Sequence, residues 1–375
     1  MTTHLSWGTP VDHLRRTRPD RAVLYLSPAV LHDTARRFTD GFPGLVTYAV
    51  KANPHEAVLA NLLAAGITAF DVASPAEMQA VRRLAPGAVL HYNNPVRSPD
   101  EVALAAQIGV ASASVDDTAE LDKLAPLPKT TEIAVRLALP VPGAAYDFGA
   151  KFGAAPDQAV TLLQEVARRG HPPAICFHPG TQCADPEAWA SYIRAAADVA
   201  ARAGLRLARL NVGGGFAAHR AAAAPDLDAI FARIEAATRA AFGPATPALY
   251  CEPGRAMVAE AMTLATRIKA VRSGAVFLND GIYGALAEAR DIGAPARLRA
   301  LSPCGTPRRG RPKPCVVFGP TCDSLDRLPG EVPLPEDLAP GDYVLFDGMG
   351  AYAACLATAF NGYGPTGPVT VGRVA

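Results

Sequence analysis

Net charge and lysine are both scarce in this sequence. Lys and Arg together number 36 against 35 Asp and Glu, so the formal charge is only +1. A protein that binds nucleic acid regardless of sequence needs a basic excess or a basic run to neutralise phosphates. The densest basic run, residues 308–313, is interrupted by Gly and Pro and is typical of an exposed loop. We therefore expect no nucleic-acid partner.

Paired cysteines and long apolar runs are also missing. The seven cysteines are scattered, odd in number and form no CxxC pair, which argues against a disulfide framework and a zinc cluster. The first residues lack the basic start and apolar core of a secretory signal, and no uncharged stretch approaches the ~20 apolar residues of a membrane span. We expect a soluble, cytoplasmic protein with no metal site and no membrane partner.

Hydrophobic residues are plentiful, at 50% of the chain, and only 19% of residues are charged. This composition excludes a disordered chain and predicts a sizeable core. At roughly 150 residues per domain, 375 residues make two or three domains, or one large barrel with an appendage.

Short β-branched runs alternate with Ala-, Leu- and Arg-rich segments from residue 45 onward. Helix starts are marked by Ser74 and Ser98, each followed by Pro and, three residues on, by Glu. This alternation predicts an α/β fold, a (β/α)8 TIM barrel, with an open doubly wound sheet as the alternative. The eight predicted strands cover residues 45–50, 68–73, 88–92, 113–116, 132–139, 174–178, 210–213 and 248–252.

The pattern changes after residue 261, where strand-like runs are separated by Gly- and Pro-rich loops. Strands are predicted at 262–270, 275–278, 315–318 and 342–346, with one amphipathic helix at 353–358. A further strand at 22–27 could pair into this mainly β domain. The predicted domains are therefore 1–27 (an N-terminal strand joining the β domain), 28–260 (the barrel) and 261–375 (the C-terminal β domain).

Polar residues follow many of the predicted barrel strands at the end where TIM barrels place their functional groups. A barrel built only for stability does not need so many ionisable groups at one end. These residues are Lys51, Asp71, Ser74, Asn93, Asn94, Arg136, His178, Gly213–Gly215, Glu252 and Arg255.

Lys51 is the most informative of them, because the chain has only six lysines and this one follows an apolar strand. A lysine that leaves a buried strand suits Schiff-base chemistry, although a rim ion pair with a carboxylate explains it too. Gly213–Gly215 could cradle a phosphate or form a tight turn, and Arg255 could bind that phosphate or pair with Glu252. His178 could be a core histidine, and helix capping alone explains Glu77. Together, a lysine, a phosphate cradle, a histidine and an acid indicate pyridoxal 5′-phosphate.

Seven motifs that follow one another along the chain support this interpretation, and the resemblance they carry covers residues 22 to 364. They resemble the ornithine/diaminopimelate decarboxylase family of fold-type III pyridoxal-phosphate enzymes, and most closely its ornithine decarboxylase branch. The motifs are YAVKAN (48–53), FDVAS (70–74), CEPGR (251–255), NDGIYG (279–284), GPTCDSLD (319–326), MGAY (349–352) and FNGY (360–363).

The resemblance implies a role for each matching residue around the cofactor. Lys51 would form the internal aldimine, His178 would stack on the pyridine ring, and Glu252 would pair with the ring nitrogen. Alanine racemases of this fold carry an arginine at that last position, so the acid favours decarboxylation. The remaining cofactor residues implied are Gly213, Gly214, Gly215, Arg255, Tyr352 and Thr181 at the phosphate, with Asp71, Glu77 and Arg136 nearby.

The resemblance also implies a homodimer with shared active sites. Cys322 and Asp323 would reach into the partner's site, Cys322 as the general acid that protonates the decarboxylated carbon. Lys151 and Asp326 match positions that pair across that interface. Without the surrounding motif, Cys322 would be taken as an ordinary buried cysteine.

The implied substrate is a basic amino acid, first L-ornithine, decarboxylated to putrescine in polyamine biosynthesis. Asp323 would bind its distal amine, with Tyr283 and Phe360 beside it. The family's second acid falls on Ile292 in an ungapped match; Asp291 is one residue away, but Arg290 precedes it and could meet an anionic side chain. Lysine, diaminopimelate and other ω-substituted amino acids, an acidic one included, therefore stay open.

Two hypotheses that assign the chain to other functional classes are weaker. An inactive regulator with the decarboxylase fold would have lost the cofactor residues, which are all present here. A barrel that uses Lys51 as an aldolase Schiff base would not need a C-terminal β domain carrying Cys322.

Overall fold

The computed structural model describes residues 7–140, 151–220 and 223–374, which fall into two compact units. The barrel unit comprises residues 35–217 and 225–254, and the β unit comprises 1–34, 218–224 and 255–375. The β unit thus takes residues 28–34 and 255–260, which the sequence assigned to the barrel. Contacts explain this: Thr34 donates a hydrogen bond from Oγ1 to the carbonyl of Met257 (2.6 Å), and the amide of Ser27 donates to Ala261 (2.9 Å).

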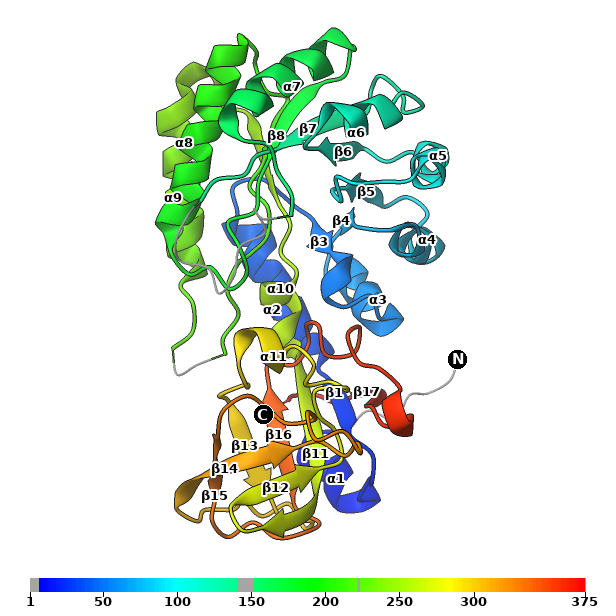
Figure 1. Cartoon of the computed structure of the whole chain (residues 1–375), viewed down its shortest axis with the longest axis vertical. Helices are drawn as coiled ribbons and strands as arrows, with labels where there is room; N and C mark the ends of the chain where they lie inside the picture. The colour runs from blue at the N-terminus through cyan, green and yellow to red at the C-terminus, as the bar shows by residue number, and fades with distance from the viewer. Residues whose placement is uncertain (1–6, 141–150, 221–222, 375) are drawn as a thin grey trace. The chain divides into compact units, whose positions relative to one another are not determined.

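The barrel unit contains a parallel sheet of short strands (Figure 1). Hydrogen-bonded neighbours follow the order β2-β10-β9-β8-β7-β6-β5-β4-β3. The strands are β2 (Leu45–Val46), β3 (Tyr48–Ala49), β4 (Ala69–Val72), β5 (Val89–Tyr92), β6 (Ser112–Val115), β7 (Glu132–Arg136), β8 (Pro173–Cys176), β9 (Arg209–Asn211) and β10 (Ala248–Cys251).

The first predicted strand, 45–50, is split into β2 and β3, and this split closes the barrel. β2 pairs with β10, whereas β3 pairs with β4 on the other side. Thr47 joins the two segments, and its amide donates to the carbonyl of Cys251 at 2.9 Å. One continuous piece of chain therefore serves as the strand that completes the ring, and the predicted TIM barrel is confirmed.

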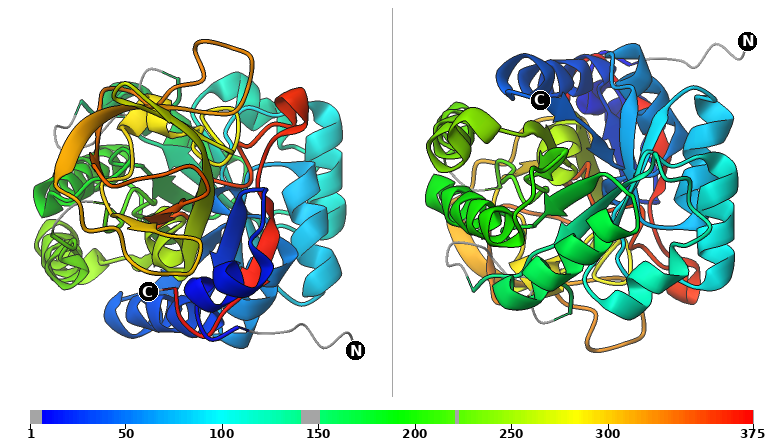
Figure 2. Two further views of the ribbon diagram at one scale, coloured as in Figure 1. Left: turned by 90° about the horizontal axis from the view of Figure 1, so that it is seen from below. Right: turned by 90° about the horizontal axis from the view of Figure 1, so that it is seen from above.

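Helices surround these strands, as the right-hand view of Figure 2 shows. Ser98 and Glu101 form a complete capping box at the start of α5, as predicted. At α4 the second hydrogen bond of the capping box differs, because the Glu77 carboxylate accepts from the amide of Ala73 (2.7 Å) rather than from that of the N-cap residue Ser74. The helices are α2 (Pro28–Gly41), which begins in the β unit, α3 (Glu56–Ala64), α4 (Pro75–Leu84), α5 (Pro99–Ile108), α6 (Thr118–Lys123), α7 (Pro156–Arg168), α8 (Pro186–Ala203) and α9 (Leu227–Phe242), with short η1 (Val50–Ala52) and η2 (Gly243–Ala245).

The β unit is organised around one long strand, β11 (Met262–Arg272). Its first half pairs with β1 (Val23–Leu26) and β16 (Tyr343–Asp347), and its second half pairs with β12 (Ala275–Leu278). The other elements are α1 (Pro10–Thr17), α10 (Arg255–Val258), η3 (Ala259–Ala261), α11 (Ala289–Ile292), β13 (Leu298–Leu301), β14 (Pro312–Phe318), β15 (Val332–Pro335), η4 (Phe360–Gly362) and β17 (Thr366–Thr370).

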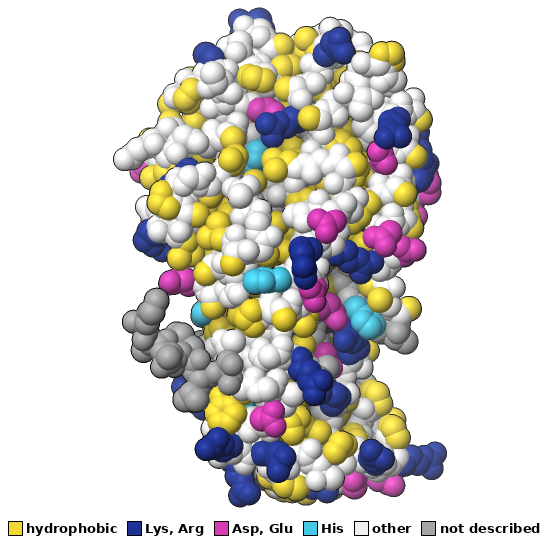
Figure 3. Space-filling model, turned by 180° about the vertical axis from the view of Figure 1, so that it is seen from behind, with side chains coloured by type: hydrophobic (Ala, Val, Ile, Leu, Met, Phe, Trp, Pro, Cys, Tyr) yellow, Lys and Arg dark blue, Asp and Glu magenta, His cyan; other side chains and the backbone are white. Residues whose placement is uncertain are grey.

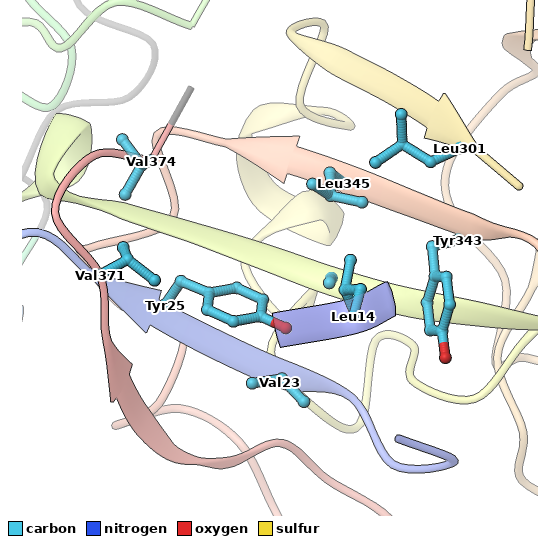
Figure 4. Packing of buried hydrophobic residues seen from close by; sticks show 9 residues of the cluster. Leu14, Val23, Tyr25, Leu301, Tyr343, Leu345, Val371 and Val374 are labelled. Carbon is cyan, nitrogen blue, oxygen red and sulfur yellow. The ribbon is translucent and has the colours of Figure 1, made fainter. Parts of the chain in front are cut away.

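Both ends of the chain enter this sheet. β1 lies between β11 and β17, which it pairs with in parallel, and Trp7 bridges to Val371. The predicted entry of the N-terminal strand into the β domain is therefore confirmed. Figure 4 shows the core that results, in which apolar side chains from both ends of the chain pack with those of the central strands. This cluster comprises Leu14, Val23, Tyr25, Ala265, Leu301, Tyr343, Leu345, Val371 and Val374.

The helix predicted at 353–358 is wrong, because the segment consists of bends and turns. Thr358 is tied by its amide and its hydroxyl to the carbonyl of Tyr283, both at 2.8 Å, which holds the segment against the NDGIYG motif. Sequence analysis also missed β13, β15 and β17. All three are short, and β15 and β17 contain Pro or Gly, residues that are depleted in strands.

Charged side chains of both signs are interspersed on the face shown in Figure 3, without a continuous basic patch there. Among the described residues, no helix is long and apolar enough to cross a membrane.

Candidate active site

Lys51 lies in η1, directly after β3, where the parallel strands end. Its Nζ is 3.6 Å from Oδ2 of Asp71, which is buried in the neighbouring strand β4. The β3–β4 register places Ala49 opposite Asp71, so the amine and the carboxylate leave adjacent strands together. The Lys51 side chain remains 46% exposed and is therefore reachable by a ligand.

Glu252 follows β10 and is buried, and two asparagines hold its carboxylate. Asn93 donates from Nδ2 to Oε1 of Glu252 (2.6 Å) and to Oδ1 of Asp71 (3.2 Å). Asn211, at the end of β9, donates from Nδ2 to the same Oε1. Glu252 therefore pairs with amides and not with Arg255, the partner that the sequence had left open. Burial and then the Asp71 carboxylate raise the pKa of Glu252 above its usual value.

His178 presents a neutral ring. Its Nδ1 accepts a hydrogen bond from the amide of Gly180 at 3.1 Å, which leaves Nε2 to carry the proton. Burial, followed by the Lys51 and Arg136 charges, lowers the pKa of His178 well below its usual value. A flat, uncharged imidazole suits stacking on an aromatic ring better than a cation that requires solvation.

The Gly213–Gly215 loop lies against His178. A Cβ added at Gly214 would be 3.3 Å from Nε2 of His178, and one at Gly215 would be 3.1 Å from its Cε1. Within the described part of the chain, the amides of Gly214 and Gly215 donate no hydrogen bond, so they remain free to bind an anion. Only glycine leaves the loop close enough for this.

Gly213→Ala is expected to lower the free energy of unfolding by about 2–5 kcal/mol, measured by denaturant titration. The residue has φ +71°, which costs a non-glycine residue about 1–2 kcal/mol. Its added Cβ would lie 2.0 Å from the carbonyl oxygen of Phe177, and such crowding costs about 1–3 kcal/mol more. Gly170→Ala is the control, because Gly170 also has positive φ but faces open space. Equal losses in the two variants would contradict the close approach.

The remaining predicted barrel residues lie on different elements. Glu77 is on α4, and burial, then the Asp71 carboxylate, raise its pKa. Arg136 ends β7, with its guanidinium 5.2 Å from the ring centre of Phe152. Thr181 is buried three residues after His178.

Arg255 and Tyr352 come together within the β unit. The Arg255 guanidinium lies 4.7 Å from the Tyr352 ring centre and makes a two-pronged ion pair with Glu288, with one branch at 2.6 Å. Tyr352 has a left-handed backbone (φ +58°), which a bulky residue adopts only under constraint. Glu288 was not singled out from the sequence.

The loop that carries Cys322 and Asp323 is exposed in the β unit. Tyr283 donates from its hydroxyl to Oδ2 of Asp323, and the Tyr283 ring lies 5.1 Å from that of Phe360. The amide of Cys322 donates to Oδ1 of Asn361 at 3.2 Å. The GPTCDSLD, NDGIYG and FNGY motifs, which are far apart in sequence, therefore form one local cluster.

Asp326 has a role within its own chain. It is buried, and its carboxylate accepts hydrogen bonds from the amide of Ile282 (3.0 Å) and the hydroxyl of Thr321 (2.7 Å). The predicted pairing of Asp326 with Lys151 across an interface stays a prediction. Arg290 and Asp291 both lie exposed on α11.

The barrel residues fit pyridoxal phosphate by their donor chemistry: an amine for the aldehyde, a carboxylate for the ring nitrogen, a flat neutral ring and a glycine cradle that any Cβ would fill. A barrel of this kind combined with a β unit defines the fold of the fold-type III enzymes.

Comparisons with known proteins support this fold and this cofactor. The model of the pyridoxal-binding domain of pyridoxal-dependent decarboxylases matches residues 29–259. The chain is 34% identical to a lysine/ornithine decarboxylase of Selenomonas ruminantium, covering 85% of this chain and 81% of the relative. It is 31% identical to mouse ornithine decarboxylase, covering 84% and 73%. The structure of a Paramecium bursaria Chlorella virus arginine decarboxylase bound to agmatine superimposes with TM-score 0.85 at 27% identity, covering 96% and 98%.

The chain therefore belongs to the pyridoxal-dependent decarboxylase family. It is a pyridoxal-phosphate-dependent amino-acid decarboxylase.

Proposed function

We propose that this enzyme decarboxylates a basic amino acid, first L-ornithine, to give putrescine for polyamine biosynthesis. The observation that carries the proposal is the partly exposed Asp323 carboxylate, which Tyr283 and the amide of Leu325 hold in place beside Cys322. Hydrogen bonding to Tyr283 lowers the pKa of Asp323, which favours the ionised form that binds an ammonium group. Relatives named for ornithine, lysine and arginine support a basic substrate.

When bound, pyridoxal phosphate supplies the electron sink for the pair of electrons left as the substrate carboxylate departs as CO₂. Lys51 would provide the amine that attaches the aldehyde, and His178 would cover the ring face. Glu252 would pair with the ring nitrogen and favour its protonated form. We assign Gly213–Gly215, Thr181, Arg255 and Tyr352 to the phosphate, and Asp71, Glu77 and Arg136 to the surroundings of the cofactor.

Cys322 is assigned the proton that replaces the lost carboxylate, delivered in the active site of a second copy of the chain. The cysteine is exposed, and its loop carries Leu325, whose side chain is 69% exposed. Leu356 and Phe360 are exposed apolar residues of the same unit. Solvent-exposed apolar side chains beside a catalytic loop favour a homodimer with shared sites.

A cytoplasmic location is part of the proposal, because none of the seven cysteines, all of which lie in described residues, forms a disulfide, as is usual in a reducing compartment.

The proposal is tested by CO₂ release from ornithine, lysine, arginine, diaminopimelate and glutamate. We expect kcat/KM for ornithine to exceed that for lysine by about 10- to 200-fold. This is the discrimination between two substrates that one methylene group gives in a pocket of matching size. Asp323→Asn should raise KM for ornithine, because the isosteric amide lacks the charge. Activity confined to an acidic substrate would overturn the proposal and assign the substrate side chain to Arg290 instead.

A further inference from the structure

We propose that Asn93 and Asn211 form an amide clamp that favours the ionised form of Glu252 and keeps it aimed at the ring nitrogen of the cofactor. Both are positioning residues, because they act through Glu252 and not on the substrate. The inference rests on the role proposed for Glu252 and adds two residues to which no function has been assigned here.

The two amides converge on one oxygen. Asn93 Nδ2 is 2.6 Å from Oε1 of Glu252, and Asn211 Nδ2 donates to the same atom. In the described residues no hydrogen bond reaches the other oxygen, Oε2. The clamp therefore fixes the carboxylate from one side and leaves one oxygen for a ligand.

The direction of the amides selects the charge state of the carboxylates. An ionised carboxylate only accepts hydrogen bonds, whereas a protonated one also donates. The nitrogen of Asn93 faces both Glu252 and Asp71, while its buried Oδ1 has no hydrogen-bond partner among the described residues. Turning the amide over would place Oδ1 against two carboxylates. Asn93 thus leaves its own oxygen unsatisfied in order to donate to two acids.

The surroundings of Glu252 otherwise disfavour its ionised form. Burial and the nearby Asp71 raise the pKa of Glu252, whereas Lys51, the Asn211 hydrogen bond and Arg136 lower it. Losing an amide donor removes one of the interactions that favour the ionised form. The ring nitrogen would then lose the acceptor that keeps it protonated.

Asn211 also connects the clamp to the glycine loop. Its Oδ1 accepts from the amide of Gly213 at 2.8 Å, and the carbonyl of Gly213 accepts from the amide of Glu252 at 2.9 Å. Gly213 is therefore fixed from both sides by the residues at the ring-nitrogen end. Changes at Asn211 should disturb both the ring nitrogen and phosphate binding, whereas changes at Asn93 should disturb the ring nitrogen alone.

The first measurement uses the enzyme without cofactor, labelled with ¹³C at the glutamate side-chain carboxyls. Glu252→Gln assigns the Glu252 signal, whose titration is followed by NMR. Asn93→Asp and Asn93→Leu should each move the Glu252 pKa upward by about one unit, a tenfold change in its protonation equilibrium. Asn94→Asp is the matched control, because Asn94 is the next residue but donates to the Ala73 carbonyl instead. An unchanged Glu252 titration in both Asn93 variants would overturn the clamp.

The second measurement uses the holoenzyme with ¹⁵N-labelled cofactor. The ring-nitrogen signal should move toward the unprotonated position in Asn93→Leu, with kcat about tenfold lower and KM unchanged. Asn211→Leu should show the same shift and also weaker cofactor binding. If Glu252→Gln leaves the ring-nitrogen signal of the wild type unchanged, the role proposed for Glu252 fails. If Glu252→Gln moves that signal but Asn93→Leu does not, only the clamp fails.

Discussion

Lys51→Ala is expected to slow CO₂ release by roughly 10²- to 10⁴-fold and to remove the visible absorption of covalently bound cofactor. Lys51 is the lysine placed at the strand ends of the barrel, 3.6 Å from Asp71 and 46% exposed. Its loss removes the amine that we propose attaches the cofactor. The measurements are steady-state CO₂ release and the absorption spectrum after reconstitution with pyridoxal phosphate.

Two control variants distinguish the loss of the Lys51 amine from the loss of its positive charge and from the loss of any lysine. Lys51→Arg keeps a cation for Asp71 but has no amine that can attach an aldehyde, so it should be as inactive as Lys51→Ala. Lys129→Ala removes an exposed lysine elsewhere in the barrel unit and should leave the spectrum unchanged. A Lys51→Ala enzyme that keeps the spectrum and the activity would show that another lysine holds the cofactor.

Mixing the inactive Lys51→Ala protein with the slow Cys322→Ala protein should restore about one quarter of wild-type activity, in addition to the residual activity of the Cys322→Ala protein. Random reassembly makes half of the dimers mixed, and each mixed dimer has one intact site when Lys51 and Cys322 come from different chains. Alone, Cys322→Ala should slow decarboxylation and divert some turnover to protonation at the wrong carbon. Activity is measured after the two proteins are unfolded and refolded together.

The control for the mixture combines both substitutions in one chain and mixes that protein with wild type. These mixed dimers have one site with Lys51 only and one with Cys322 only, so both sites fail and activity falls to about one quarter. If the two single variants do not complement each other, both residues belong to sites within one chain and the shared-site dimer is wrong. Unchanged product partition in Cys322→Ala would remove its role as proton donor.

The regular parts of the fold were predictable because hydrophobic periodicity fixes them. The predicted strand 275–278 coincides with β12, and the predicted barrel strands agree within a few residues. The segment 353–358 was not predictable, because its bends depend on two hydrogen bonds to Tyr283, 75 residues away. Local sequence carries no sign of such a partner.

The charged residues of the candidate site were found because each follows a strand or lies in a known motif. Asn93 was recognised from the sequence as a polar residue at a strand end but was given no role, and Asn211 was missed, since an asparagine after a strand is equally common in an ordinary turn. Their role becomes visible only in the folded structure, where both contact Glu252, which is 159 residues from Asn93 in the sequence. Glu288 was missed for the same reason, because its partner Arg255 is 33 residues earlier.

The pairing of β1 with β17 has a consequence for how the protein is made. The barrel unit is complete once the ribosome has passed residue 254, whereas the sheet of the β unit needs its final strand, Thr366–Thr370. Val23 and Tyr25 must wait for Thr366 and Val369, more than 340 residues later in synthesis. The β unit, which carries the Cys322 loop, is therefore completed later in synthesis than the barrel unit.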